Sequence, residues 1–127
     1  MATEGGVAGR RVLIVEDEAG IAEVLADLLG DEGYETAVSM DGAALAEAAG
    51  APPALILLDV MMPGMDGPEV CRRLKADPRT AGVPVVFLTA LPRETLAARL
   101  GDCPYDDVLS KPFTLDGVLA VVRRHLG

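Results

Sequence analysis

Short apolar runs recur along the chain, and each is followed by polar residues and then by a segment with helical periodicity. Three of these runs, 12–15, 54–58 and 85–88, contain no polar residue. An unbroken run of this length is typical of a strand that is buried on both faces of a parallel sheet. Two less apolar segments are similarly short. Five strands are therefore predicted, over residues 12–15, 34–38, 54–59, 85–89 and 107–110.

Between these runs, apolar residues return every three or four positions, as in helices that bury one face. Residues 21–29 give one such stripe, and Gly30 and Gly33 follow it as stop signals. Asp41 is a suitable N-cap for the next helix, and Pro68 stands in the first turn of the third. Five helices are predicted, over 21–29, 41–50, 68–76, 92–100 and 114–126.

Alternating strands and helices indicate an α/β fold, because right-handed crossovers make the strands parallel and put helices on both faces of the sheet. With five strands, we expect a doubly wound five-stranded parallel sheet of order 2-1-3-4-5, the flavodoxin-like topology. In this order the first and third strands are neighbours where the winding reverses. Side chains that follow these two strands should then lie close together at the carboxyl edge of the sheet.

The chain has 127 residues, which is enough for one domain with a single core. We expect this domain to cover residues 11–127, behind a flexible N-terminal tail of residues 1–10 that contains three glycines. Only two Phe, two Tyr and no Trp are present, so the core must be aliphatic and few rings are available to stack on nucleic acid bases.

The net charge of −9 would repel phosphate backbones and anionic membranes, which disfavours direct binding to nucleic acid or membrane. No apolar stretch approaches the ~20 residues of a membrane-spanning helix, and the first residues lack the apolar region of a secretory signal. The chain is therefore expected to be cytoplasmic. Cys71 and Cys103 are too few for a disulfide framework or a zinc site, and we interpret them as reduced thiols.

Acidic residues follow both of the strands that should be neighbours, Glu16 and Asp17 after the first and Asp59 at the end of the third. Three carboxylates at one edge repel one another, and a hard divalent cation relieves that repulsion. Mg²⁺ commonly binds one or two carboxylates, several waters and a phosphate oxygen. The acidic residues therefore predict half of a magnesium site.

Thr89 and Lys111 lie at the ends of the other two strands and bring a hydroxyl and an ammonium group to the same edge. These groups suit a phosphoryl group, and a carboxylate can accept one as a nucleophile, forming an aspartyl phosphate. Asp59 is the candidate nucleophile. Each residue taken alone has a structural explanation, such as a helix cap or a surface charge. Their joint placement at strand ends of one sheet favours a site.

Four segments, VLIVEDE, LILLDVMMPGMDG, VVFLTA and DDVLSKPF, follow one another over about residues 11–126. In this order and spacing they resemble the receiver domain of response regulators in two-component signal transduction. The resemblance implies that Asp59 is the phosphoacceptor and that Glu16 and Asp17 bind Mg²⁺ together with it. It also implies that the backbone carbonyl of Met61 is a further metal ligand.

By the same resemblance, Thr89 is the switch hydroxyl, Lys111 contacts the phosphoryl group, and the peptide bond between Lys111 and Pro112 is cis. A sensor histidine kinase, a phosphotransfer protein or a small phosphodonor would supply the phosphoryl group. The domain would catalyse its own phosphorylation and a slow dephosphorylation. The fourth helix, the last strand and the last helix would form the surface for a homodimer or an output partner.

The chain departs from the family pattern at two places near its last strand. Val108 stands three residues before the lysine, where the family usually has Tyr or Phe, so we expect weaker coupling between the site and the partner surface. Pro104 and Tyr105 stand where the family commonly has Gly-Ala, ahead of two acidic residues. We interpret Tyr105 as a ring packed on the surface.

Other functions are weighed against a phosphorylatable receiver. A pseudo-receiver of the same fold would act as an interaction module without phosphorylation, and the sequence leaves this alternative open. A haloacid-dehalogenase-like phosphatase is disfavoured because Met61 occupies the position of its second acid. Flavodoxin-type cofactor binding is disfavoured because the acidic residues 16–18 would repel the cofactor phosphate. Whether the domain is free-standing or part of a longer regulator is also open.

Overall fold

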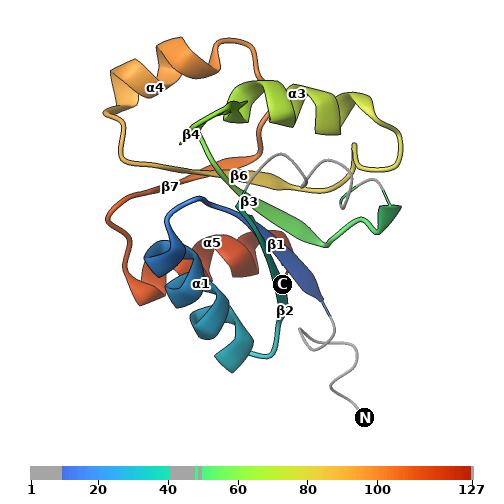
Figure 1. Cartoon of the computed structure of the whole chain (residues 1–127), viewed down its shortest axis with the longest axis vertical. Coiled ribbons are helices and arrows are strands. Elements are labelled where there is room, and N and C mark those ends of the chain that lie inside the picture. Colours follow the sequence, from blue (N-terminus) through green and yellow to red (C-terminus); the bar gives the residue numbers. More distant parts are fainter. Residues whose placement is uncertain (1–9, 41–47, 49, 127) are drawn as a thin grey trace.

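The computed structural model describes residues 10–40, 48 and 50–126, and one parallel five-stranded sheet lies at its centre (Figure 1). The strands are β1 (Arg11–Val15), β2 (Glu35–Ser39), β3 (Leu55–Asp59), β6 (Val85–Thr89) and β7 (Asp107–Ser110). They lie in the order β2-β1-β3-β6-β7, and every neighbouring pair is parallel. The predicted doubly wound order 2-1-3-4-5 is therefore confirmed.

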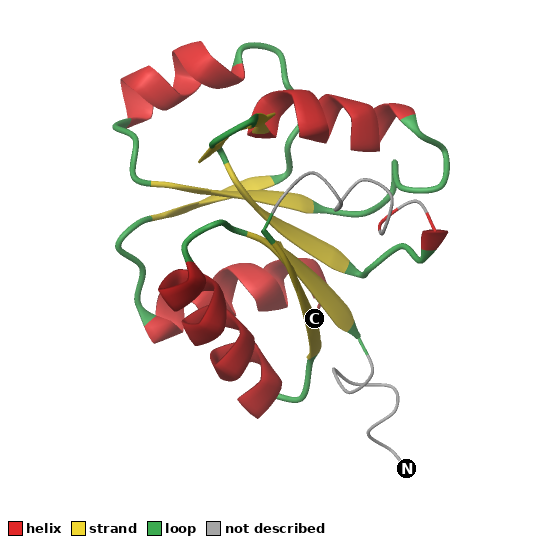
Figure 2. Ribbon diagram, in the orientation of Figure 1, coloured by secondary structure: helices red, strands yellow, loops and turns green. Residues whose placement is uncertain are grey.

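Helices cover both faces of the sheet (Figure 2). In the described residues they are α1 (Ala19–Asp31), α3 (Gly67–Ala76), α4 (Arg93–Leu100) and α5 (Leu115–Leu126). One face packs against α1 and α5, and the other against α3 and α4. The predicted helix over 41–50 with Asp41 as its N-cap, and the predicted tail over 1–10, lie outside the described residues except for Arg10, Ala48 and Gly50. No helix in the part of the chain described here could span a lipid bilayer.

The boundaries agree with the sequence prediction to within one residue, except at α1. This helix begins at Ala19 and continues through Gly30 to Asp31, so Gly30 is not a stop signal. A glycine inside a helix lowers its stability but does not end it. The turn into β2 comes at Gly33, where φ is 96° and a residue with a side chain would be strained.

Strands β3 and β6 are buried along their whole length, which explains why only their last residues, Asp59 and Thr89, are polar. All five side chains of β3 and all five of β6 are buried. Leu58 and Phe87 point to the cluster under α3 and α4, whereas Leu57 and Leu88 point to the cluster under α1 and α5. Burial of one such side chain stabilises the fold by roughly 1.5–3 kcal/mol. The sheet is therefore rigid where β3 delivers Asp59 to its edge.

A short antiparallel hairpin, β4 (Met61–Met62) and β5 (Met65–Asp66), follows β3 where the sequence predicted a loop. Its turn uses Gly64 at φ 75°. Gly67 then brings the chain back onto the end of β3, where a Cβ would lie 2.6 Å from the Asp59 carbonyl oxygen and 2.8 Å from that of Val60. Its N–H donates to the Val60 carbonyl oxygen at 3.2 Å. Only glycine fits this approach without moving the backbone around Asp59.

We predict that Gly67→Ala lowers the free energy of unfolding by about 1–3 kcal/mol, because the added methyl group meets backbone atoms that cannot rotate away. Gly30→Ala is the matched control, since no atom lies within 4 Å of a Cβ at that helical position. This control should be neutral or more stable by up to ~1 kcal/mol. Urea unfolding of both variants provides the measurement, and a Gly67→Ala variant as stable as the parent would contradict the close approach.

Candidate functional site

Three carboxylates meet at the carboxyl edge of the sheet, where β1 and β3 end side by side. Asp59 is the last residue of β3, and Glu16 and Asp17 directly follow β1. The pairing of Val15 with Leu58 sets this alignment. One oxygen from each of the three carboxylates lies within 4.8 Å of the other two. The fold therefore brings together the three acids that the sequence places at strand ends.

Two of these acids are buried, Glu16 completely and Asp59 with 6% of its surface exposed. Backbone groups hold both carboxylates. The N–H of Glu18 donates to Glu16 Oε2 at 3.1 Å, and the N–H of Met61 donates to Asp59 Oδ1 at 3.1 Å. Such bonds offset part of the cost of removing a charge from water. The other oxygen of Asp59, Oδ2, faces Lys111.

Lys111 is the cation of the cluster. Its Nζ lies 2.7 Å from Glu16 Oε1, 3.5 Å from Asp59 Oδ2 and 3.9 Å from Glu18 Oε1. Burial lowers the pKa of Lys111, but its hydrogen bond to Glu16 and the charge of Asp59 outweigh burial and raise that pKa above the usual value. Lys111 is therefore an ammonium group at neutral pH. The peptide bond between Lys111 and Pro112 is cis, as the family resemblance implied.

Thr89 ends β6 and is 3% exposed. Its Oγ1 accepts a hydrogen bond from the Leu91 N–H at 2.9 Å, so the hydroxyl hydrogen remains available as a donor. The carbonyl oxygen of Thr89 accepts a hydrogen bond from the Lys111 N–H at 2.7 Å. The hydroxyl and the ammonium group that the sequence predicts for this edge are thus held on adjacent strand ends.

Burial and repulsion make Asp59 an unusual carboxylate. Its pKa is raised from 3.8 to about 6, because burial disfavours the charged form and because Glu16 adds a hydrogen bond and a second negative charge. The Met61 N–H and the Lys111 ammonium group act in the opposite direction and only partly compensate. A further positive charge at this edge would therefore favour the ionised, nucleophilic form of Asp59.

The donor set fits Mg²⁺. Three carboxylate oxygens lie close enough to contact one ion, and hard divalent cations prefer oxygen ligands. A single ammonium group cannot neutralise three carboxylates, so the cluster keeps a net negative charge. The Met61 side chain is 49% exposed and does not fill the site. The backbone carbonyl of Met61, two residues after Asp59, remains the further ligand that the family resemblance implies.

Comparison with known proteins identifies the family. The family model of the response regulator receiver domain matches residues 12–123. The chain belongs to the response-regulator receiver family. The matched residues include every segment on which the sequence resemblance depended, so the family and the fold expected from the sequence are confirmed.

The receiver is similar to parts of longer regulators. It is 44% identical over 119 residues to the DNA-binding response regulator MtrA of Mycolicibacterium paratuberculosis, covering 92% of this chain and 51% of that protein. It is 45% identical over 114 residues to the response regulator PleD of Caulobacter vibrioides, covering 89% of this chain and 25% of that protein. The chain thus spans about half the length of the MtrA relative.

Solved structures of other receivers have the same fold. The chemotaxis protein CheY4 of Vibrio cholerae superposes with a TM-score of 0.86 at 30% identity, covering 94% of this chain and 100% of that one. The receiver domain of the sensor histidine kinase PA1611 from Pseudomonas aeruginosa gives a TM-score of 0.85 at 27% identity, covering 94% and 99%. That structure has a magnesium ion coordinated in its active site cleft.

The two departures from the family pattern lie together beside α4. The ring of Tyr105 packs on Phe87, with centroids 5.7 Å apart at 56°, and Tyr105 is 42% exposed. The interpretation of Tyr105 as a packed surface ring is therefore confirmed. Val108 is half-buried against the cluster under α3 and α4. Both residues line a cavity of about 470 Å³ between α4 and β7.

Asp106, just before β7, and Asp107, the first residue of β7, do not join the site. Asp106 Oδ2 lies 2.7 Å from the Lys75 Nζ of α3. Asp107 Oδ2 accepts one hydrogen bond from Arg124 and lies 3.0 Å from His125 Nε2, and both of these residues are in α5. These two acids therefore tie β7 to helices on both faces of the sheet.

Glu18 has a role that the sequence analysis missed. It is the N-cap residue of α1 but its side chain makes no capping hydrogen bond. Its carboxylate instead lies 3.9 Å from Lys111 Nζ and adds negative charge at the rim of the site. Nothing in the sequence distinguishes it from a capping acid, because its contact depends on the distance between β1 and β7.

Both cysteines are free thiols and both are buried, in agreement with the expectation of reduced thiols. Burial and the neighbouring Cys103 thiol raise the pKa of Cys71 to about 12. The Sγ of Cys103 donates a hydrogen bond to the Pro68 carbonyl oxygen at 3.6 Å. Thiols in such surroundings are poor nucleophiles and act as small core residues.

The raised pKa of Asp59 predicts that Asp59→Asn stabilises the metal-free protein. The folded-state pKa of about 6 lies above the value of 3.8 expected in the unfolded chain, so ionised Asp59 opposes folding. The gain should be small near pH 4, grow as the pH rises, and level off above about pH 6 at roughly 1–3 kcal/mol. Urea unfolding in EDTA at several pH values measures it.

Asp27→Asn, at an exposed position on α1, is the matched control. A gain for Asp59→Asn that is absent, or that is largest at pH 4, would show that repulsion and burial do not act on Asp59 as described.

Proposed function

We propose that the receiver accepts a phosphoryl group on Asp59 in a magnesium-dependent reaction and signals through the resulting change in conformation. The observation that supports this most directly is the position of Asp59 itself. It is a buried carboxylate that lies close to two further acids and 3.5 Å from the Lys111 ammonium group. A purely structural role does not explain this arrangement, because holding like charges close together lowers the stability of the fold.

The geometry supports different roles for the two oxygens of Asp59. Oδ1 accepts the Met61 N–H, so the carboxylate cannot rotate freely. Oδ2, 3.5 Å from Lys111 Nζ, is the oxygen that would attack phosphorus. The bond from phosphorus to the donor atom breaks as the new P–O bond forms, and the donor leaves with the electron pair. Positioning and neutralisation of charge supply most of the catalysis in such a transfer.

Lys111 and Thr89 would receive the transferred group. Lys111 is now closest to Glu16 and would turn its ammonium group toward the phosphoryl oxygens. The Thr89 hydroxyl would donate a hydrogen bond to the same group. Bound Mg²⁺ would be held by Glu16, Asp17, Asp59 and the Met61 carbonyl, and would neutralise the carboxylates and the incoming phosphoryl oxygens. The charge now carried by Lys111 alone would then be shared with the metal.

Movement of Thr89 provides a route from the site to a surface. The Thr89 carbonyl oxygen accepts a hydrogen bond from the Lys111 N–H. The Thr89 hydroxyl oxygen accepts one from the N–H of Leu91, which lines the cavity between α4 and β7. We therefore propose that α4, β7 and α5 form the surface for a homodimer or an output partner. Val108 changes its buried area less than an aromatic ring would, so the coupling should be weaker than in receivers with Tyr or Phe there.

The phosphodonor would be a sensor histidine kinase, a phosphotransfer protein or a small phosphodonor, and a cytoplasmic location is consistent with each. The relative MtrA is a DNA-binding regulator, but only about half of its length corresponds to this chain. We propose that this chain does not itself bind nucleic acid, because its net charge is −9. The domain is proposed to extend over residues 11–127.

The central test is phosphorylation by acetyl phosphate, followed by intact-mass measurement. We expect addition of one phosphoryl group in the presence of Mg²⁺, little addition in EDTA, and none in Asp59→Asn. Asp27→Asn should be phosphorylated like the parent. Absence of the added mass, or equal addition to Asp59→Asn, would instead favour the pseudo-receiver, an interaction module that does not turn over phosphate.

The phosphorylated form should be long-lived. The positions two residues after Asp59 and two after Thr89 are Met61 and Leu91, and neither can orient a water molecule for attack on phosphorus. Met61→Asn and Leu91→Glu should each speed phosphate loss about fivefold, the effect of one hydrogen bond of ~1 kcal/mol to the attacking water. The double variant should be faster still.

Met61→Leu keeps the position apolar and should decay at the parental rate. Leu91 already packs partly against the cluster under α3 and α4, so melting curves must first show that Leu91→Glu is folded. If all three polar variants lose phosphate no faster than the parent, these two side chains do not shield the site.

A further inference from the structure

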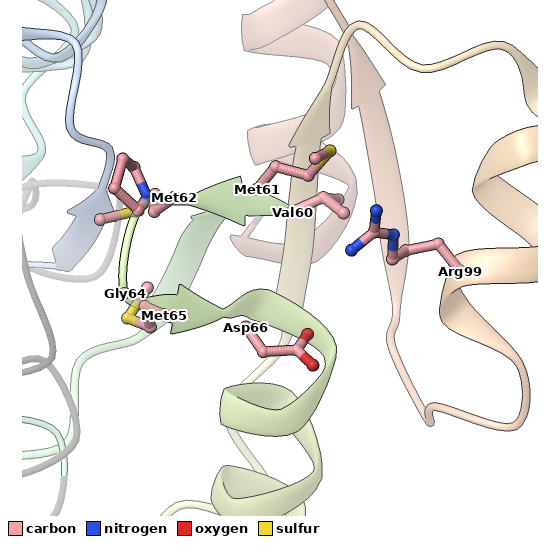
Figure 3. Close-up of a pocket in the computed structure, with 8 residues that line it drawn as sticks. Val60, Met61, Met62, Gly64, Met65, Asp66 and Arg99 are labelled. Atoms are coloured by element: carbon pink, nitrogen blue, oxygen red, sulfur yellow. The ribbon is translucent and has the colours of Figure 1, made fainter.

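A cavity of about 620 Å³ lies between the β4–β5 hairpin and α4, beside the acidic cluster but separate from its carboxylates (Figure 3). Its apolar lining includes Val60, Met61, Met62 and Met65. Methionine side chains are flexible and polarizable, and they adapt to apolar ligands of different shape. The volume is within the range of roughly 300–1,000 Å³ that is usual for small-molecule sites.

Two opposite charges line the same cavity, Asp66 from the end of the hairpin and Arg99 from α4. Figure 3 shows the carboxylate of Asp66 and the guanidinium group of Arg99 on opposite sides of one open space. Neither side chain forms an ion pair with another residue in the described part of the chain. The charges are therefore available to a ligand.

The residues around Asp66 and Arg99 leave both charged groups without a partner in the described part of the chain. Asp66 is the N-cap residue of α3, where an aspartate usually bonds to the first N–H groups of the helix, yet its side chain makes no such bond. Arg72, on the neighbouring helix α3, lies 3.8 Å from Glu69 and 3.6 Å from Asp102. Two acids thus lie near Arg72, whereas the guanidinium group of Arg99 points toward Val60 and Met61 (Figure 3).

We propose that this cavity binds a small zwitterionic molecule of amino-acid type with a flexible apolar side chain. Its carboxylate would pair with Arg99, whose planar guanidinium group matches a carboxylate in two hydrogen bonds. Its ammonium group would pair with Asp66. The apolar side chain would lie among Met61, Met62 and Met65.

The charges favour a zwitterion over other small ligands. A purely anionic ligand would approach a chain of net charge −9 and would bring its charge next to Asp66. A purely cationic ligand would leave Arg99 without a partner and repel it. An uncharged apolar molecule would use neither group. A zwitterion satisfies both charges and adds no net charge to the protein.

A ligand bound in the cavity would affect the acidic cluster through the backbone that connects them. Val60 and Met61 directly follow Asp59, and the Met61 N–H donates to Asp59 Oδ1 at 3.1 Å. A ligand that orders the hairpin would therefore order the group that holds the Asp59 carboxylate. Binding itself does not depend on the proposed phosphorylation and would stand if Asp59 were never phosphorylated.

Methyl NMR of the full chain labelled at methionine tests the proposal. The chain has five methionines, and Met40, which is 49% exposed after β2, serves as a reference outside the cavity. Titration with norleucine should shift the methyl signals of Met61, Met62 and Met65 saturably and leave Met40 unchanged. N-acetylnorleucine, which lacks the ammonium group, and norleucinamide, which lacks the carboxylate, should each bind about fivefold more weakly.

Two variants test which charged side chain binds which charged group of the ligand. Arg99→Gln should weaken norleucine binding about fivefold without weakening norleucinamide, whereas Asp66→Asn should weaken norleucine without weakening N-acetylnorleucine. Their melting curves should match that of the parent, because both side chains are exposed. Binding of norleucinamide to Arg99→Gln and of N-acetylnorleucine to Asp66→Asn is a further check that each variant is folded.

Three results would overturn the proposal. The first is the absence of saturable shifts at the three cavity methionines. The second is tighter or equal binding of N-acetylnorleucine, which would indicate a site for anions or for an acidic protein surface. The third is an Arg99→Gln variant that binds all three probes like the parent, which would mean that Asp66 and Arg99 merely neutralise each other.

Discussion

Repulsion among three carboxylates that are held at the end of a rigid sheet is the constraint on which the rest of this receiver depends. Glu16 is fully buried and Asp59 nearly so, and neither can move away because β1 and β3 are paired along their length. Lys111 compensates only part of this charge, as the raised pKa of Asp59 indicates. A positive charge that enters the site, or loss of the charge on Asp59, therefore stabilises this cluster.

The fold holds this unfavourable cluster in place through packing elsewhere. Eight buried apolar side chains, four consecutive ones in each of β3 and β6, stabilise the sheet far more than the acids destabilise its edge. The close approach of Gly67 fixes the backbone after Asp59, and salt bridges from Asp106 and Asp107 fix β7, the strand that Lys111 follows. Stability and reactivity are therefore located in different parts of the same strands.

Most of the sheet could be predicted because its strands are buried on both faces and therefore contain apolar runs that no helix of that length would show. The residues at the carboxyl edge of the sheet could then be predicted as well, since a doubly wound order fixes which strand ends are neighbours. The β4–β5 hairpin could not be predicted, because two-residue strands have no periodicity. The partners of Glu18 and Asp107 could not be predicted either, because they lie 93 and 17 or 18 positions away along the chain and only the packing of β7 and α5 brings them near.

The contact between Tyr105 and Phe87 gives the molecule an internal optical reporter. The chain has no Trp and only two Tyr, so its near-ultraviolet absorbance and emission arise almost entirely from these phenol rings. Tyr34 is buried in the cluster under α1 and α5, whereas Tyr105 lies half-exposed on the opposite side of the sheet, two strand positions from Thr89 through Phe87. A change in the environment of β6 and α4 therefore alters one chromophore and spares the other, and unlabelled protein can report which face of the sheet has moved.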